Sequence, residues 1–263
     1  MAFSVPLGSR TILHRALTQA QQWGLVIRNV AENVKPPRSA PSTRQVWEPH
    51  EARTFLASIK GHPLEALFLL ALTTGMRRGE LLGLRWQDVD EARSQVHIRQ
   101  NIVTAAGKLT TTTPKSRRSV RAVPIPPDTL AALQAHREAQ QATREKAGDN
   151  WADLDLIFTN HHGTSVGMNL TRVWYELRDA AGVKRIRFHD LRHTYASVAA
   201  SRKQVSAQVI SERLGHFSVA FTLQTYVHLF DEERRRAVHT TENLFADEAE
   251  TETPVEAIGV KQG

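Results

Sequence analysis

Apolar residues recur at helical spacing in several stretches of the chain. From Ile12 to Trp23 they fall on one stripe, which predicts a helix that ends at Gly24. Pro49 and Pro63 each stand where a proline fits the first turn, so they predict two further helices, the second too apolar to lie on the surface. More helices are predicted over residues 127–146, 169–181, 189–201, 205–214 and 218–228.

Alternating apolar and polar residues predict a small sheet. Such alternation occurs over Val96–Arg99 and over Arg121–Ile125, and Gly107 and a run of threonines separate the two stretches. We expect the two stretches to pair as antiparallel strands. The predicted fold class is therefore α+β, mainly α with a small antiparallel β-sheet.

Composition divides the chain into parts. The segment from Lys35 to Ser42 is rich in proline and serine and too poor in apolar residues to pack, so we interpret it as belonging to a linker. The predicted organisation is a small helical part over residues 1–38, a linker over residues 39–46, a main domain over residues 47–245, and an acidic, disordered tail over residues 246–263.

Charge is distributed unevenly along the chain. The whole sequence holds 34 Lys and Arg against 27 Asp and Glu, but residues 231–263 hold 9 acidic and 4 basic residues, so the body before them is the more cationic part. A cationic body is typical of nucleic-acid binding, although an anionic membrane surface would attract it as well.

Several classes of chemistry and location are excluded. The chain has no cysteine, which rules out disulfides, thiolate zinc sites and a cysteine nucleophile. It has no run of about 18 apolar residues, and its first ten residues lack the charged start and apolar centre of a secretory signal. We therefore expect a cytoplasmic protein without a membrane partner.

Two short motifs place cationic side chains where an anion could bind. Arg77 follows Gly75, which ends a buried helix, and a short helix is expected from Glu80, so Arg77 would lie at a helix N-terminus. The alternative is a surface arginine that pairs with Glu80. His189 and Arg192 are three residues apart at the start of a predicted helix, so they share a face and could grip one phosphate.

The histidine motif has an alternative interpretation as a metal site. His189 and His193 have the four-residue spacing of the zinc-binding H-E-x-x-H helix. That motif needs glutamate in second place, where this chain has Asp190, and no obvious third ligand follows. We therefore expect neither a metal ion nor another cofactor.

A tyrosine near the end of the predicted helices is the last candidate. Taken alone, Tyr226 would most simply be a half-buried core tyrosine. Gly215 ends one helix and Ser218 can cap the next, so the chain can fold back between His216 and Tyr226.

Together these motifs resemble the tyrosine recombinases of the phage-integrase family. The resemblance covers roughly residues 10–240, and it is specific because five separated motifs match in order and spacing although each is weak alone. It implies the catalytic-domain fold of these DNA breaking and rejoining enzymes. The motifs are Thr74-Gly75-Met76-Arg77-x-x-Glu80, Pro114-Lys115-Ser116 ahead of Arg121-x-Val123-Pro124, His189-x-x-Arg192, Leu214-Gly215-His216, and Tyr226.

The resemblance assigns a role to each residue of these motifs. Guanidinium groups suit a phosphodiester because they bind its oxygens in bidentate fashion without losing their proton. The implied roles are phosphate binding for Arg77 and Arg192, paired histidines at His189 and His216, the hairpin lysine and general acid at Lys115, and the nucleophile at Tyr226. Among these, His189 is our candidate for the base that assists the tyrosine, and Lys108 is a weaker candidate for the acid.

The implied activity is site-specific DNA recombination or integration through a 3′-phosphotyrosine intermediate, without metal or ATP. The implied partners are double-stranded DNA attachment sites, a homotetramer assembled on DNA, and DNA-bending accessory proteins, and the implied location is the bacterial nucleoid. Two alternatives stay open. One is a type IB topoisomerase-like enzyme that religates the same strand, and the other is a remnant that binds attachment sites without cutting them.

The sequence departs from the family pattern at its N-terminus. Only about 38 residues precede the linker, and through Arg28–Val34 they resemble the last helices of the family's core-binding domain. We therefore expect a truncated product or a fragment in which half of the DNA clamp is missing.

Overall fold

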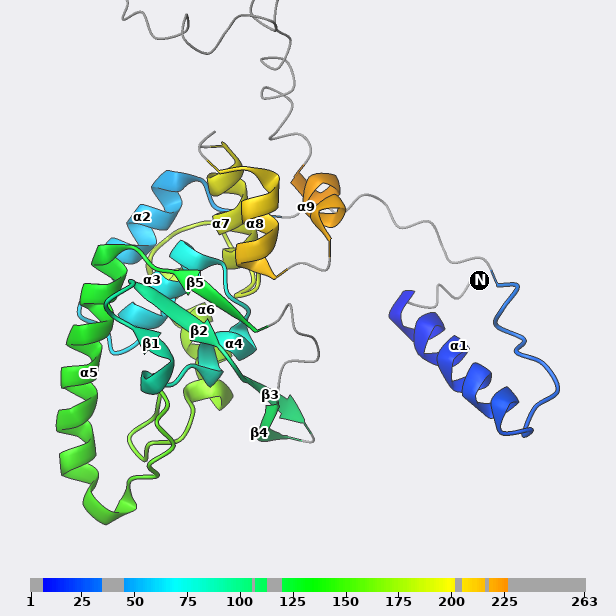
Figure 1. The fold of residues 1–263 in the computed structure, drawn as a ribbon, viewed down its shortest axis with the longest axis horizontal. Coiled ribbons are helices and arrows are strands. Elements are labelled where there is room, and N and C mark those ends of the chain that lie inside the picture. The colour runs from blue at the N-terminus through cyan, green and yellow to red at the C-terminus, as the bar shows by residue number, and fades with distance from the viewer. Residues whose placement is uncertain are drawn as a thin grey trace, which may run out of the picture. The chain divides into compact units, whose positions relative to one another are not determined.

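The computed structural model describes residues 7–34, 45–105, 107–112, 120–201, 205–215 and 218–226 (Figure 1). For residues 7–10 and 224–226 it describes the backbone alone. The chain divides into two compact units, Met1–Arg44 and Gln45–Gly263, and each is described by itself. Within the described ranges, no helix is long and apolar enough to cross a membrane.

The first unit contains helix α1 (Leu7–Gln22), which confirms the helix predicted from the apolar stripe. Gly24, with a φ of +72°, turns the chain after the helix. The side-chain amide of Asn29 then donates to the carbonyl of His14 at 2.9 Å and to Thr18 Oγ1 at 2.8 Å, so the following segment folds back on α1. Large apolar side chains of this unit stay exposed, among them Ile12, Trp23, Leu25 and Ile27.

The second unit holds the other described elements. Its α-helices are α2 (Pro49–Ser58), α3 (Glu65–Thr74), α4 (Arg78–Gly83), α5 (Pro127–Ala147), α6 (Leu170–Ala180), α7 (Asp190–Ser201), α8 (Ala207–Leu214) and α9 (Val219–Tyr226). Its strands are β1 (Val89–Asp90), β2 (Gln95–Ile98), β3 (Asn101–Ala105), β4 (Lys108–Thr112) and β5 (Arg121–Pro124), and short 3₁₀ helices cover Trp86–Asp88, Gly148–Asn150 and Val166–Met168.

The strands form two antiparallel ladders. β2 lies between β1 and β5 in a three-stranded sheet, which confirms the predicted pairing of the two alternating stretches. β3 and β4 form a separate hairpin that projects from the body of the unit (Figure 1). Thr110–Thr112 of the threonine run, which was expected only to separate two strands, therefore lie in a strand of their own, β4.

A cluster of buried aromatic rings holds the helices of this unit together. Trp47, Phe55, Phe68 and Trp174 are fully buried, with neighbouring ring centroids 5.0 to 5.6 Å apart. Such pairs add about 0.5–1.5 kcal/mol each beyond the area that they bury. Trp47 also donates its indole N–H to the carbonyl of Lys184 at 2.7 Å. The cluster thereby joins α2, α3 and α6 to the segment that leads into α7.

Of the two helix starts predicted from prolines, one is confirmed and the other is shifted. Pro49 is the first residue of α2, where Glu48 and Glu51 complete a capping box, so this start is confirmed. The helix expected from Pro63 begins instead at Glu65, because Pro63 belongs to the turn before it. The prediction of a buried helix is confirmed, since α3 packs against both α5 and α7.

Candidate active site

The carboxyl end of α8 receives three arginine side chains from distant parts of the chain. The last carbonyl groups of a helix have no partner within the helix and form the negative end of its dipole, so cations are favourable there. The three bonds run from Arg121 Nε to the carbonyl of Arg213 at 2.8 Å, from Arg192 Nη2 to that of Leu214 at 2.7 Å, and from Arg77 Nη2 to that of Gly215 at 2.8 Å.

Glu80 joins two of these arginines. Its side chain is 2% exposed, and it accepts hydrogen bonds from the backbone N–H of Arg77 at 2.8 Å and from Arg77 Nη1 at 2.9 Å. Arg121 adds a bidentate pair, with Nη1 and Nη2 each 3.0 Å from one carboxylate oxygen. Burial alone would raise the pKa of Glu80, but the bonds and charges of Arg121 and Arg77 outweigh it, so the pKa is lowered and the group is ionised.

We call Arg77, Arg121, Arg192 and Glu80 the arginine cluster. The cluster contains three guanidinium groups and one carboxylate, so it has two more positive than negative charges. Arg77 is the accessible member, because its side chain is 40% exposed, whereas Arg192 is only 4% exposed. A buried excess of positive charge beside an accessible arginine is suited to binding an anion.

The structure corrects the predicted start of α4. The helix begins at Arg78, not at Glu80, and Arg77 is its N-cap residue. The reason is that the Glu80 carboxylate reaches back to the N–H of Arg77 and completes the first turn. The two interpretations of Arg77 therefore hold together, because it is paired with Glu80 and also lies at a helix start.

One glycine, Gly75, allows the elements of the cluster to approach one another. Gly75 follows α3 with a φ of +65°, and a Cβ there would lie 2.5 Å from Tyr195 Cδ1 and 2.6 Å from Leu214 Cδ2. The carbonyl of Gly75 accepts a bond from Arg192 Nη1 at 2.9 Å. Only a glycine fits this backbone conformation and this spacing without strain, so α3, α7 and α8 can meet here.

His189 lies immediately before α7, beside the arginines. Partial removal of its ring from water lowers its pKa most, and the charge of Arg192 lowers it further. Arg187 and Arg77 act in the same direction, and Asp190 opposes them without reversing the shift. The imidazole is therefore neutral at neutral pH and able to accept a proton.

The neighbouring Asp190 is fully engaged. It is 3% exposed and accepts bonds from Arg187 through the backbone N–H at 2.8 Å, Nε at 3.0 Å and Nη2 at 2.9 Å. The rings of His189 and His193 lie 5.3 Å apart in an edge-to-face arrangement. Across the described ranges, no group of three or more His, Cys, Asp or Glu side chains could hold a metal ion.

The structure does not describe two of the predicted site residues, and it describes only the backbone of a third. Lys115 and His216 lie outside the described residues, and Tyr226 is the last residue of α9, for which the backbone alone is described. α9 packs against α7 and α8, so the helix that ends with Tyr226 contacts the elements that carry Arg192 and the bound carbonyls. Lys108, the weaker acid candidate, is exposed at the start of β4.

Sequence reasoning missed the part that Arg121 plays, although a signal was present. In the antiparallel pair, Arg121 lies opposite Ile98 and two residues before Val123, and both of these side chains are buried. Residues two apart in a strand share a face, so the alternation places Arg121 toward the interior. A buried charge needs partners within the protein, and Arg121 finds a carboxylate partner in Glu80.

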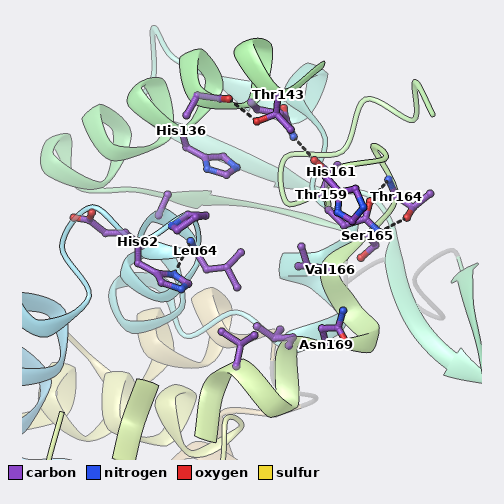
Figure 2. A pocket seen from close by; sticks show the side chains of 18 of the residues that line it. His62, Leu64, His136, Thr143, Thr159, His161, Thr164, Ser165, Val166 and Asn169 are labelled. Carbon is purple, nitrogen blue, oxygen red and sulfur yellow. Dashed lines mark hydrogen bonds between the residues drawn. The ribbon is translucent and has the colours of Figure 1, made fainter. Parts of the chain in front are cut away.

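A cavity of about 700 Å³ lies away from the arginine cluster, lined by parts of α5, the turn before α3 and residues 159–170 (Figure 2). His136 projects into it from α5 and donates through Nε2 to the carbonyl of Ile157 at 2.9 Å, while His62 Nδ1 accepts from the N–H of Leu64 at 3.0 Å. Burial lowers the pKa of both histidines. The described lining includes no arginine or lysine, so this cavity is not suited to a phosphate.

Comparison with known proteins gives relatives along most of the chain. A tyrosine recombinase XerC-like protein from Caldanaerobacter subterraneus subsp. tengcongensis is 35% identical in an alignment of 223 residues that covers 80% of this chain and 57% of that protein. The ICEBs1 integrase of Bacillus subtilis is 27% identical over 237 residues, which are 89% of this chain and 64% of that protein. The chain thus spans about three fifths of the length of these relatives.

Solved structures confirm the predicted fold. The Tn1549 transposon integrase, in complex with a circular intermediate DNA, aligns with a TM-score of 0.66 at 18% identity, over 90% of this chain and 80% of that one. XerA recombinase aligns with a TM-score of 0.60 at 22% identity, over 88% and 77%. Both support the mainly helical α+β architecture.

A model of the phage integrase family matches residues 43–233, which is well over half of the sequence. This range contains the whole arginine cluster and all six predicted site residues. The chain therefore belongs to the phage integrase family of tyrosine recombinases.

Proposed function

We propose that this chain carries the catalytic part of a site-specific DNA recombinase that cleaves and rejoins strands through Tyr226. The observation that supports this most is the arginine cluster at the carboxyl end of α8, with its excess of two positive charges and its accessible Arg77. His189 supports it further, because its lowered pKa keeps a neutral imidazole next to those charges.

In the proposed reaction, the Tyr226 hydroxyl attacks the scissile phosphorus while the bond to the 5′-oxygen breaks. Negative charge then accumulates on the non-bridging oxygens, where Arg77 and Arg192 stabilise it. Arg77 would contact the phosphate directly, and the charge of buried Arg192 is weakly screened because little water surrounds it. Preorganised cations of this kind can replace the metal ions that many phosphoryl-transfer enzymes use.

Two proton transfers complete the cleavage step. A tyrosine phenol has an ordinary pKa near 10, so it needs a base, and His189 is our candidate to receive its proton. The leaving 5′-oxygen needs a proton as its bond breaks, and Lys115 is our candidate to supply it, while His216 would hydrogen-bond the phosphate. The 5′-hydroxyl of a partner strand then attacks the phosphotyrosine and releases the phenol, so the bond energy is conserved and no ATP is consumed.

The proposed partners are duplex attachment sites and further copies of this chain. The Tn1549 integrase was solved with a circular intermediate DNA, and lambda integrase was solved as a dimer on a core site. By analogy we propose a tetramer on DNA, working at the bacterial nucleoid, with DNA-bending accessory proteins as further partners. We also propose that residues 1–38 belong to a helical core-binding domain, because Ile12 of α1 and Trp23 just after it are exposed, as on one helix of a bundle.

Covalent capture tests the proposed activity without knowledge of the attachment site. The full chain is incubated with a library of nicked duplexes that carry a randomised core, in which release of a short strand prevents religation. A protein–DNA adduct that survives denaturing electrophoresis, with a common sequence in the captured strands, is the expected result. Failure to form any adduct under conditions where DNA binding is measurable would favour the alternative of a binding remnant.

A further inference from the structure

We propose that Arg121 is a positioning residue that holds both phosphate-binding arginines in place, through Glu80 on one side and the carboxyl end of α8 on the other. This inference rests on the proposed function, because it concerns how the cluster acts on a scissile phosphate. Arg121 itself would not contact the DNA.

The hydrogen bonds of Arg121 are directed inward. Nε donates to the carbonyl of Arg213 at 2.8 Å, and Nη1 and Nη2 each bond one oxygen of Glu80 at 3.0 Å. All three nitrogens of the guanidinium are therefore engaged by the protein, and the side chain is only 9% exposed. A lysine could not reproduce this fork, since its single ammonium cannot bind two carboxylate oxygens in one plane and a carbonyl beside them.

Two routes lead from Arg121 to the phosphate-binding arginines. In the first route, Glu80 bonds Arg121 with both oxygens and also fixes Arg77 through its backbone N–H and Nη1. In the second route, the carbonyl that Arg121 binds immediately precedes the carbonyls of Leu214 and Gly215, which Arg192 and Arg77 bind. Loss of Arg121 would therefore release the carboxylate and the helix end together.

Strand β5 determines where the guanidinium lies. Arg121 is the first residue of β5, opposite Ile98 of β2, and it is held by a ladder whose side chains on this face are buried. The strand and α8 are also in contact. The sheet thereby fixes one side of the cluster while α3 and α7 fix the other.

Gly215 gives independent geometric support. A Cβ at this position would lie 2.8 Å from Arg121 Nη1 and 3.0 Å from its Cζ, so the guanidinium packs directly against the glycine. Gly182, which follows α6, has nearly the same φ, +66° against +62° for Gly215, but a Cβ there would meet nothing within 4 Å. The two glycines form a matched pair, because alanine is strained at a positive φ in both but would displace Arg121 in only one.

A purely structural ion pair is the competing explanation, and the chain contains a matched example. Arg85 binds the buried Asp88 through Nε at 2.8 Å and Nη2 at 3.0 Å, and within the described residues its side-chain hydrogen bonds do not reach α8 or Glu80. Arg85→Gln and Arg121→Gln therefore both remove a guanidinium from a buried carboxylate. Only the second change should alter how the phosphate is stabilised.

The test compares two substrates for each variant. One is a duplex recovered by covalent capture, and the other is the same duplex with a methylphosphonate at the scissile position, where a methyl group replaces one non-bridging oxygen and removes its charge. On the phosphodiester, Arg121→Gln should slow cleavage by on the order of 10-fold or more, with DNA affinity nearly unchanged. On the methylphosphonate the loss should be clearly smaller, because less negative charge remains for Arg77 and Arg192 to stabilise.

Gly215→Ala should show the same substrate dependence as Arg121→Gln, whereas Gly182→Ala and Arg85→Gln should slow both substrates by one common factor, if at all. Arg121→Lys should not restore the wild-type ratio. An equal loss on both substrates in Arg121→Gln would overturn the positioning role, and so would a substrate dependence of the same size in Arg85→Gln.

If the wild-type chain forms no adduct, that result counts against the proposed function alone. A second measurement then still tests the positioning role of Arg121. Amide hydrogen exchange is measured for the full chain and for the Arg121→Gln and Arg85→Gln variants. In Arg121→Gln, exchange should accelerate both in residues 77–84 and in residues 207–215, because both segments lose the same guanidinium. Unchanged exchange in these segments, or equal acceleration in Arg85→Gln, would overturn the coupling.

Discussion

Replacing Glu80 by glutamine tests how strongly the buried carboxylate holds the site together. Glu80 is 2% exposed and accepts from Arg77 and from both terminal nitrogens of Arg121, which is itself 9% exposed. The amide has the same shape, but it offers one acceptor oxygen, and its NH₂ group would face N–H donors. Arg121 would then keep a buried charge without an anionic partner, and at least one of its N–H groups would face another donor.

Breaking a buried ion pair on one side lowers the free energy of unfolding by about 3–5 kcal/mol. For a domain of this size about 1 kcal/mol corresponds to roughly 2–4 °C in Tm, so Glu80→Gln should lower Tm by roughly 6–20 °C. Glu176→Gln is the control, because Glu176 pairs with Arg172 on the surface, where both side chains are more than half exposed. That change should alter the free energy of unfolding by about 1 kcal/mol or less.

The stability difference between the wild-type chain and Glu80→Gln should also depend on pH in a predictable direction. The pKa of Glu80 is lower in the folded state than its ordinary value of 4.5, so folding favours the ionised form. Its contribution is fully present above pH 4.5 and is lost as the pH falls through the lower, folded-state pKa. Urea unfolding of both proteins should therefore show a difference that is constant near neutral pH and shrinks in acid. A difference below about 1 kcal/mol at pH 7, as in an exposed pair, would refute the reasoning.

Three further predictions concern the reaction. Arg192→Ala should slow cleavage on the order of 10²-fold or more, as expected for the loss of one preorganised charge, and a loss under about fivefold would contradict its role. Because the pKa of His189 is lowered from 6.5, the midpoint of the fall in cleavage rate with decreasing pH should lie below 6.5; a midpoint at or above 6.5 would contradict His189 as the base. EDTA should leave cleavage unchanged, and inhibition by EDTA would revive the metal site of His189 and His193.

The sequence predicts the parts of the fold that have a regular pattern and misses those that lack one. β2 and β5 pair as expected, because their alternating residues have one buried face each. The hairpin of β3 and β4 was not predicted because most of its side chains are exposed on both faces, so no apolar alternation marks it. The start of α3 was misplaced because proline fits a turn as well as a first helical turn.

The sequence names candidate site residues one by one, but it does not give their arrangement. The spacing of Arg77 and Glu80 already indicated their contact, because they are three positions apart. The convergence on α8 depends on bonds between residues that are 138 positions apart for Arg77 and 92 for Arg121, and no local pattern encodes such contacts. The alternation that turns Arg121 inward shows that part of this arrangement was nevertheless present in the sequence.

The central claim, that Tyr226 is the nucleophile, is tested most directly by mapping the covalent adduct. The sequence contains three tyrosines, Tyr175, Tyr195 and Tyr226, so mass spectrometry of the DNA-linked peptide can distinguish them. Tyr195 is the relevant competitor, because its ring lies against Gly75 beside the arginine cluster. We predict that the linked peptide contains Tyr226, and that Tyr226→Phe forms no adduct while its DNA affinity stays nearly unchanged, since one hydroxyl and no charge is lost. An adduct on Tyr195 or Tyr175, or one that persists in Tyr226→Phe, would contradict the claim.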